Sequence, residues 1–262
     1  MKQRKKKLAV FKFASCDGCQ LSLLDCEDEL LAVAGAVDIA HFLEASSRIR
    51  RGPYDVTLVE GSVTTEHDAL RIQKIREQSK ILVTIGACAT SGGIQALRNS
   101  RDIAEMVRVV YASPQYISTL DTSTAISDHV HVDYELRGCP VNKHQLLSVL
   151  TSLLHGQVPR VPSHPVCLDC KRSGVVCVSV VDGTPCLGPV THTGCDALCP
   201  RYGRGCFGCY GPSDTPQVAA QALVLRRQGQ SDAQIAAGYA SFNVGMQPFA
   251  QEFAKGLAKD KR

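Results

Sequence analysis

The chain has 262 residues, of which 44% are hydrophobic, and carries a formal net charge of +4. Such a length accommodates one large domain, or a mid-sized domain followed by a small one. The excess of Lys and Arg lies in residues 1–7 and 255–262, so the residues between them are net negative. Because no basic stripe with interleaved aromatic residues is present, nucleic acid is excluded as a partner. Because no apolar run approaches ~18 residues, we expect no membrane insertion.

The chain contains 13 cysteines. At the N-terminus a basic start precedes the apolar run 8–13, but this run is too short for the core of a secretory signal, and no twin-arginine pair accompanies it. We therefore expect a cytoplasmic protein. In a reducing compartment, cysteines serve metal binding or redox chemistry rather than disulfides.

Residues 8–155 alternate between strand-like and helix-like patterns. Strands are predicted at 8–13, 37–43, 55–59, 81–85 and 129–136, and helices at 20–35, 65–78 and 142–155. Thr65 with Asp68 is typical of a capping box, and Asn142 and Gly156 delimit the last of these helices. Residues 100–128 are expected to be loop-rich. The alternation predicts an α/β fold with a doubly wound, mostly parallel sheet, which collects ligands at the carboxyl ends of its strands.

Four cysteines follow predicted strands. Ser15-Cys16-Asp17-Gly18-Cys19 lies between the first strand and the first helix, and Cys88 and Cys139 occupy equivalent places after later strands. A C-x2-C pair on a short loop directs both sulfurs to one centre. Gly18 lets the backbone wrap around that centre, and the helix N-terminus behind it favours anionic sulfur. We predict that Cys16, Cys19, Cys88 and Cys139 hold one iron–sulfur cluster.

Residues 158–165 contain three prolines and few large apolar residues, as in a linker. The linker divides the chain into a domain of residues 1–157 and one of residues 158–262. Residues 167–212 are too few for a large core and need internal cross-links. They contain eight cysteines, which are Cys167, Cys170, Cys177, Cys186, Cys195, Cys199, Cys206 and Cys209. Helices at 216–227 and 232–239 are expected to pack over this cysteine region.

Four ligands per cluster give three 4Fe–4S clusters from twelve cysteines. The thirteenth, Cys26, is expected to be a small buried apolar residue. The Cys195-x3-Cys199-Pro200 step resembles the bacterial ferredoxin run and favours clusters in the second region. Two structural zinc sites are the alternative, because C-x2-C pairs alone do not separate zinc from iron–sulfur. Disulfides are a third interpretation.

Three further residues could belong to a metal site. His164 and His192 lie beside or inside the cysteine region, but eight cysteines already suffice as ligands. Glu60 lies at the end of a strand and has two interpretations. It could support the metal centre or take part in a proton relay, or it could be a loop carboxylate that accepts backbone N–H bonds. The chain has no G-x-G-x-x-G after the first strand and no G-x-x-x-x-G-K-[ST], so neither motif indicates a nucleotide site.

With these residues in place, the chain resembles the small subunits of NiFe hydrogenases. The similarity spans nearly the whole chain and is carried by Ser15–Gln20, Val59–Val63, Gly86–Ala89, Arg137–Pro140, Pro185–Thr191 and Gly205–Pro212. It is most similar to the soluble cytoplasmic group, and within that group to the delta subunits of NAD(P)-linked hydrogenases, also called sulfhydrogenases. The membrane-bound uptake branch uses a histidine on one cluster and carries a twin-arginine leader, and this sequence shows neither.

The resemblance implies a flavodoxin-like N-terminal domain in which Cys16, Cys19, Cys88 and Cys139 hold a proximal 4Fe–4S cluster facing the NiFe site of a separate large subunit. The eight later cysteines would hold two further 4Fe–4S clusters that lead to flavin- and NAD(P)-binding iron–sulfur subunits. The chain would relay electrons in a hydrogen:NAD(P) oxidoreductase and would contribute no catalytic residue.

Two alternatives stay open. The chain could be the iron–sulfur subunit of another reductase, either complex I-like or linked to polysulfide or a heterodisulfide. It could also be a zinc-binding scaffold module. The corresponding subunit of complex I keeps the N-terminal fold, but it has adjacent cysteines in place of C-x2-C and lacks the eight-cysteine domain.

Overall fold

The computed structural model describes residues 4–260. The chain divides into two compact units between Arg160 and Val161. The sequence-based division into domains of residues 1–157 and 158–262, each folding on its own, stays a prediction.

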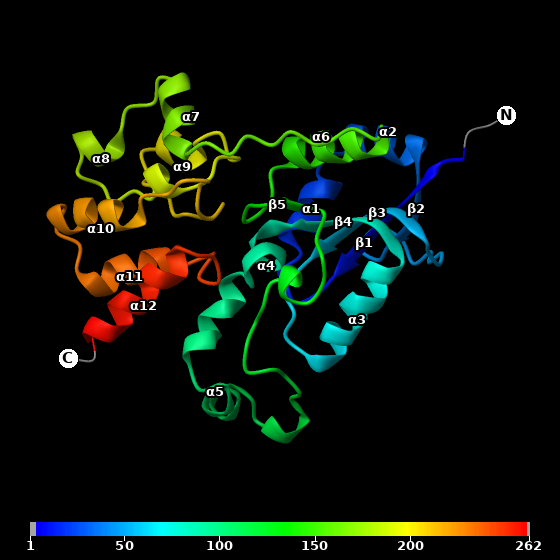
Figure 1. Ribbon diagram of the computed structural model, residues 1–262, viewed down its shortest axis with the longest axis horizontal. Helices are drawn as coiled ribbons and strands as arrows, with labels where there is room; N and C mark the ends of the chain where they lie inside the picture. Colours follow the sequence, from blue (N-terminus) through cyan, green and yellow to red (C-terminus); the bar gives the residue numbers. More distant parts are fainter. Residues whose placement is uncertain (1–3, 261–262) are drawn as a thin grey trace. The chain divides into compact units, whose positions relative to one another are not determined.

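The first unit is built on a five-stranded sheet (Figure 1). Its strands are β1 (Lys6–Lys12), β2 (Val37–Phe42), β3 (Tyr54–Glu60), β4 (Ser79–Ile85) and β5 (Tyr134–Leu136). All neighbouring pairs are parallel, and the spatial order is β2-β1-β3-β4-β5. This is the order of flavodoxin-like doubly wound sheets, in which the direction of winding reverses between β1 and β3. The predicted fold class is confirmed.

Helices cover both faces of this sheet, with α2 and α6 over one face and α3 over the other (Figure 1). The helices are α1 (Gly18–Leu24), α2 (Asp28–Ala36), α3 (Glu66–Glu77), α4 (Gly86–Ser91), α5 (Ile103–Val110) and α6 (Lys143–Leu154). Thr65 caps α3 by accepting the Asp68 N–H at 3.1 Å. The Asp68 carboxylate accepts the Thr65 hydroxyl at 3.0 Å, in place of the predicted capping box. Asn142 caps α6, as predicted.

Two stretches of the first unit differ from the prediction. The helix expected over 20–35 is broken, because Glu27 has a φ of 44° and Cys26 turns into the interior. The strand expected over 129–136 begins only at Tyr134. Its predecessor Asp133 still donates its N–H to the Leu82 carbonyl of β4 at 3.0 Å, but the Leu82 N–H donates to the Asp133 carboxylate at 2.7 Å. Residues 100–128 are loop-rich, as predicted, and contain one short helix, α5, which Asp102 caps.

The second unit consists of short helices and cysteine-bearing loops. Its helices are α7 (Val166–Arg172), α8 (Val178–Val181), α9 (Leu198–Arg201), α10 (Val218–Arg227), α11 (Asp232–Ala240) and α12 (Phe249–Asp260). None of the described helices is both long and apolar enough to cross a membrane.

The C-terminal helices pack over the cysteine region, as predicted. Tyr239 of α11 meets Phe249 of α12 edge to face, with ring centroids 5.1 Å apart. The Gln221 side chain of α10 donates to the Cys186 carbonyl at 2.7 Å, and Asn243 donates to the Gly208 carbonyl at 3.0 Å. The third helix of this group, α12, was missed in the sequence.

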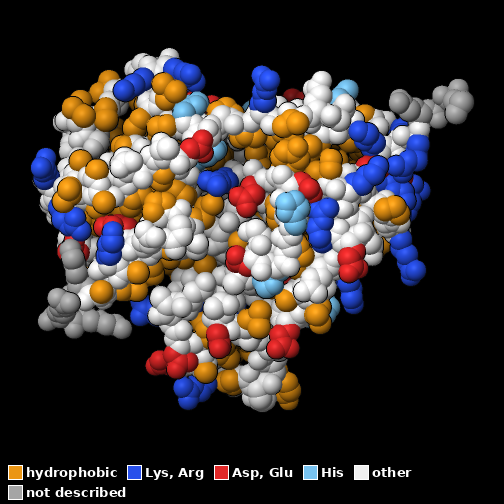
Figure 2. All heavy atoms as spheres, in the orientation of Figure 1, with side chains coloured by type: hydrophobic (Ala, Val, Ile, Leu, Met, Phe, Trp, Pro, Cys, Tyr) orange, Lys and Arg blue, Asp and Glu red, His pale blue; other side chains and the backbone are white. Residues whose placement is uncertain are grey.

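Basic side chains gather where β1 begins (Figure 2). Asp55 of β3 is buried beneath them and accepts the Lys7 N–H at 2.8 Å and the Arg4 guanidinium at 2.9 Å. Burial alone would raise the pKa of Asp55. The bond from Lys7 and the charges of Arg4 and Lys80 nevertheless hold it below its ordinary value.

Replacement of Asp55 by Asn should lower the free energy of unfolding of the chain by about 1.5–3 kcal/mol at pH 7, the range for hydrogen bonds to a charged group. A carboxylate with a lowered pKa stabilises the fold above its unfolded-state pKa, and this contribution is lost as the pH falls. The deficit of Asp55→Asn should therefore shrink below about pH 4. Urea unfolding at pH 7 and pH 3 measures it, and an equal deficit at both would contradict this account of Asp55.

Candidate metal centre

The loop between β1 and α1 carries Cys16 and Cys19 to the carboxyl edge of the sheet. The Phe13 N–H donates to the Glu60 carbonyl at 2.8 Å, so the chain leaves β1 directly beside the end of β3. Asp17 then adopts a φ of 66° and is held by the Lys12 ammonium and by the Ser15 hydroxyl, the latter at 3.1 Å. This turn leaves Cys16 exposed and directs Cys19 into the interior, at the point where ligands bind in doubly wound sheets.

Cys16, Cys19, Cys88 and Cys139 lie together at this edge. Burial raises the pKa of the Cys19, Cys88 and Cys139 thiols, that of Cys88 to about 11. Charge on Cys88 or Cys139 would raise the pKa of Cys19 further, and charge on Cys16 would raise the pKa of Cys88 and Cys139. Such mutual effects require neighbouring thiols. The structure thus brings together the four cysteines that the sequence grouped, and their role as cluster ligands stays a prediction.

Two glycines leave room for these thiols. Gly86 opens α4 with a φ of 84°, and a Cβ there would lie 2.3 Å from the Cys19 sulfur. Gly93 has a φ of 65°, and a Cβ there would lie 2.7 Å from the Cys88 sulfur. Any side chain at either position would enter the space around the thiols, in addition to straining the backbone.

Glu60 supports the first cysteine loop from the end of β3. It is buried, accepts the Cys19 N–H at 3.0 Å, and accepts the Gln20 side-chain amide at 2.7 Å. Burial raises the pKa of its carboxyl, whereas the Gln20 and Cys19 bonds lower it, and the net direction is upward. Glu60 therefore accepts a backbone N–H bond, which was one of the two sequence-based interpretations of this residue. The N–H group belongs to Cys19, a predicted cluster ligand.

Gln95 is a neighbour of the thiols that was missed in the sequence. Its amide donates to the Ala14 carbonyl at 2.9 Å, and its oxygen faces the Cys88 thiol at 3.4 Å. It thereby joins the loop after β1 to the segment after β4. Its spacing from Cys88 matches no ligand motif, so only the fold could reveal it.

In the second unit, Cys167, Cys170, Cys177 and Cys186 form one neighbourhood. Burial raises the pKa of Cys167 to about 11, and charge on Cys186, Cys170 or Cys177 would raise it further. Cys195 interacts with Cys199, and Cys206 with both Cys209 and Cys186. Of these eight cysteines only Cys177 is exposed.

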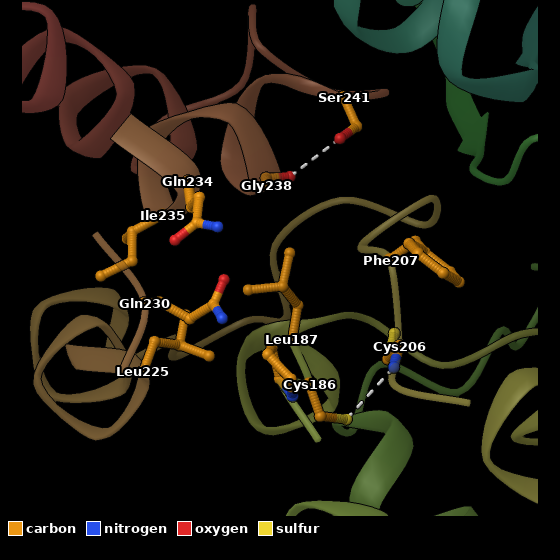
Figure 3. A pocket seen from close by; sticks show the side chains of 11 residues that line it. Cys186, Leu187, Cys206, Phe207, Leu225, Gln230, Gln234, Ile235, Gly238 and Ser241 are labelled. Atoms are coloured by element: carbon orange, nitrogen blue, oxygen red, sulfur yellow. Dashed lines mark hydrogen bonds between the residues drawn. The ribbon is translucent and has the colours of Figure 1, made fainter. Parts of the chain in front are cut away.

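Backbone N–H groups face several of these sulfurs. Cys186 Sγ accepts the Cys206 N–H at 3.2 Å and the Gly188 N–H at 3.4 Å. Figure 3 shows the first of these bonds beside an apolar cavity of about 170 Å³, which Leu225 and Ile235 of the C-terminal helices also line. The N–H groups of Ala197 and Leu198 face Cys195 and oppose the effect of burial on its pKa. Such donors stabilise thiolates.

The remaining candidates lie outside these groups. His164 bonds to Asp169 at 2.8 Å, and the His192 ring bonds to the Thr193 carbonyl. Cys26 is buried, as predicted, and its thiol donates to the Ser22 carbonyl at 3.4 Å.

Within residues 4–260, no three His, Cys, Asp or Glu side chains gather closely enough to ligate a single metal ion.

Comparison with known proteins shows the family to which the chain belongs. The model of the NADH ubiquinone oxidoreductase 20 kDa subunit family matches residues 16–153. The sulfhydrogenase 2 delta subunit of Pyrococcus furiosus is 39% identical over 221 residues, which cover 84% of this chain and 92% of that subunit. The chain belongs to the family of NiFe-hydrogenase small subunits.

Two solved structures share the fold. A chain of an NAD⁺-reducing [NiFe]-hydrogenase is 30% identical, with a TM-score of 0.56 over 61% of this chain and 96% of that one. The actinobacterial-type NiFe-hydrogenase of Ralstonia eutropha, at 17% identity, shares the fold, with a TM-score of 0.61 over 99% of this chain and 91% of that one. As a NiFe-hydrogenase small subunit, the chain is the iron–sulfur, electron-transfer component of a multi-subunit enzyme.

Replacement of Gly86 by Ala should remove iron from the first unit, because the added methyl group would overlap the Cys19 sulfur. The matched control is Gly156→Ala, where φ is also positive at 73° but no atom lies within 4 Å of the added Cβ. Iron and sulfide analysis after anaerobic purification measures the difference. Equal iron in the two variants would refute the view that Gly86 makes room for a cluster ligand.

Replacement of Glu60 by Ala leaves two buried donors without an acceptor and should cost about 1–3 kcal/mol of stability. Glu60→Gln, which keeps one acceptor oxygen, should cost less. Both should retain less iron than the wild type on desalting, because the Cys19 backbone is no longer held. Glu77→Gln, at an exposed carboxylate of α3, is the control. Unchanged iron retention in Glu60→Ala would show that Glu60 does not position Cys19.

Proposed function

We propose that this chain relays electrons by means of three 4Fe–4S clusters between the NiFe site of a large subunit and a flavin- and NAD(P)-binding iron–sulfur partner. The observation that carries the proposal is the gathering of Cys16, Cys19, Cys88 and Cys139 at the carboxyl edge of a flavodoxin-like sheet, together with eight further cysteines in a separate small unit.

Each cluster would have four cysteine ligands. Cys16, Cys19, Cys88 and Cys139 would hold the first. Cys167, Cys170, Cys177 and Cys186, whose thiols interact, would hold the second. Cys195, Cys199, Cys206 and Cys209 would then hold the third. When bound, such clusters accept and release one electron at a time.

The surroundings of the cysteine thiols favour the binding of a positively charged metal centre. The raised thiol pKa values mean that four neighbouring thiolates are unfavourable without a compensating cation, and bound iron supplies that charge. N–H groups face the sulfurs of Cys186 and Cys195, and apolar side chains surround Cys206. Both would set how stable the reduced form of a bound cluster is.

The relatives support the choice of partners. One is a subunit of a sulfhydrogenase, and another is a chain of an NAD⁺-reducing hydrogenase. NAD(P) accepts two electrons as a hydride, whereas a 4Fe–4S cluster supplies one, so a flavin in the partner is the chemical link between them. The cysteine content supports the cytoplasm as the compartment.

Metal analysis of the anaerobically purified chain tests the proposal. We expect roughly twelve irons with matching sulfide, and no hydrogen turnover without the large subunit. Two zincs with little iron would favour the scaffold alternative, and hydrogen turnover by the chain alone would contradict a pure relay role.

Replacement of Cys139 by Ala should remove the first cluster alone, lowering iron by about one third and abolishing hydrogen-linked NAD(P) reduction in the assembled complex. The control is Cys26→Ala, which should keep all iron at a cost of roughly 1 kcal/mol for a small cavity. Full NAD(P) reduction in Cys139→Ala would mean that Cys139 is not a ligand of the relay.

A further inference from the structure

Apolar side chains surround the one exposed cysteine of the second unit. Val176, Val180 and Val181 are 66%, 82% and 66% exposed, and they flank Cys177, which is itself exposed. We call these four residues the Cys177 face. Figure 2 shows hydrophobic side chains over α8 on this side of the second unit. Three exposed branched aliphatic side chains around a thiol indicate a surface that another molecule covers.

The backbone fixes this arrangement. The N–H groups of Val180 and Val181 both donate to the Cys177 carbonyl at 3.0 Å, which forms the single turn of α8. Val178 points inward and is buried, so the turn is anchored to the unit. The outward valines are thus held in place beside the thiol.

Cys177 also belongs to a group of neighbouring thiols. Its charge would raise the pKa of both Cys167 and Cys170. If this group holds a cluster, as proposed above, Cys177 is the ligand through which that cluster reaches the surface. Electron transfer weakens steeply with distance, so the most favourable place for a redox partner is directly on the Cys177 face.

Positive charges surround the Cys177 face. Lys171 and Arg172 end α7 and are exposed. Exposed Arg201 donates to Ser173 at 2.8 Å, which brings the end of α9 to the end of α7. Gln228 donates to the Ser179 hydroxyl at 2.8 Å, which brings exposed Arg227 of α10 beside α8. We call these cations the basic rim, and they are Lys171, Arg172, Arg201 and Arg227.

Few carboxylates offset the basic rim. Asp182, after α8, and Asp196, just before α9, are exposed. Asp169 of α7 is engaged by His164 and Thr193. The rim is therefore net positive, and it favours a partner whose docking surface is apolar at its centre and acidic at its edge.

We propose that the Cys177 face is the docking site of the complex's electron-accepting subunit, a redox protein with an acidic rim around an apolar patch. This inference rests on the proposed relay function and adds to it the exit position and the chemistry of the partner. The apolar centre supplies binding free energy, and the basic rim steers the partner and sets its orientation.

The test uses the assembled complex with Val180→Asp, which places a carboxylate in the apolar centre at a position that does not contribute to the core. Two hydrogen-dependent rates are measured, the reduction of NAD(P) through the partner and the reduction of a small soluble dye. The ratio of NAD(P) reduction to dye reduction should fall at least tenfold, with iron content retained. Leu70→Asp, on the 59% exposed Leu70 of α3, is the control and should keep the wild-type ratio.

A second variant tests the rim. Arg172→Glu should weaken partner binding at low salt and flatten the decline of the NAD(P) rate with rising ionic strength, because long-range attraction is screened by salt. An unchanged salt dependence would overturn the assignment of an acidic partner surface.

The other outcomes are equally decisive. A wild-type ratio of the two rates in Val180→Asp would overturn the proposal. So would a Val180→Asp complex that loses nickel and keeps the NAD(P)-linked subunit, because the large subunit would then be the protein that binds this face. A change only in self-association would overturn it as well. A wild-type complex that reduces neither dye nor NAD(P) with hydrogen would refute the relay function itself, which is distinguishable from a failure of docking.

Discussion

The structure of the first unit depends on the convergence of strand ends at the reversal point of a parallel sheet. Because β1, β3, β4 and β5 all point the same way, the loops that follow them end at one edge, and each contributes a residue to the same small space. Cys16 and Cys19 come from the first loop, Glu60 from the end of β3, Cys88 from the start of α4, and Cys139 from the turn after β5. Nothing in the local sequence of any one loop could produce this meeting.

That convergence has an electrostatic cost. Burial and the nearness of other thiols both oppose the charged form of the cysteines, and the pKa of Cys88 rises to about 11. The surrounding residues leave room for the four thiols and hold their backbone in place. Gly86 and Gly93 keep side chains out of the space, and Glu60 holds the Cys19 backbone in place. In the second unit, N–H groups directed at the sulfurs of Cys186 and Cys195 favour the thiolate form of these cysteines. A bound cation of high charge is the natural complement of such a site.

Much of this could be predicted from the sequence, since the strand and helix patterns of the first unit and the cysteines after its strands are local signals. The parts that were missed depend on tertiary structure. The helix breaks at Glu27, beside the buried Cys26, and just before β5 the Asp133 carboxylate accepts the Leu82 N–H while the backbone makes the other bond. Gln95 acquires its place only because β1 and β4 end at the same edge. The grouping of the eight later cysteines likewise required coordinates, because their spacing alone fits several pairings.

The central claim is that three separate groups of thiols each hold iron. Anomalous scattering at the iron absorption edge, from crystals of the anaerobically purified complex, tests it most directly. We predict three separate iron positions in this chain, one against Cys16, Cys19, Cys88 and Cys139 and two among the cysteines of the second unit. Iron in the second unit alone, or a zinc signal at either place, would contradict the account.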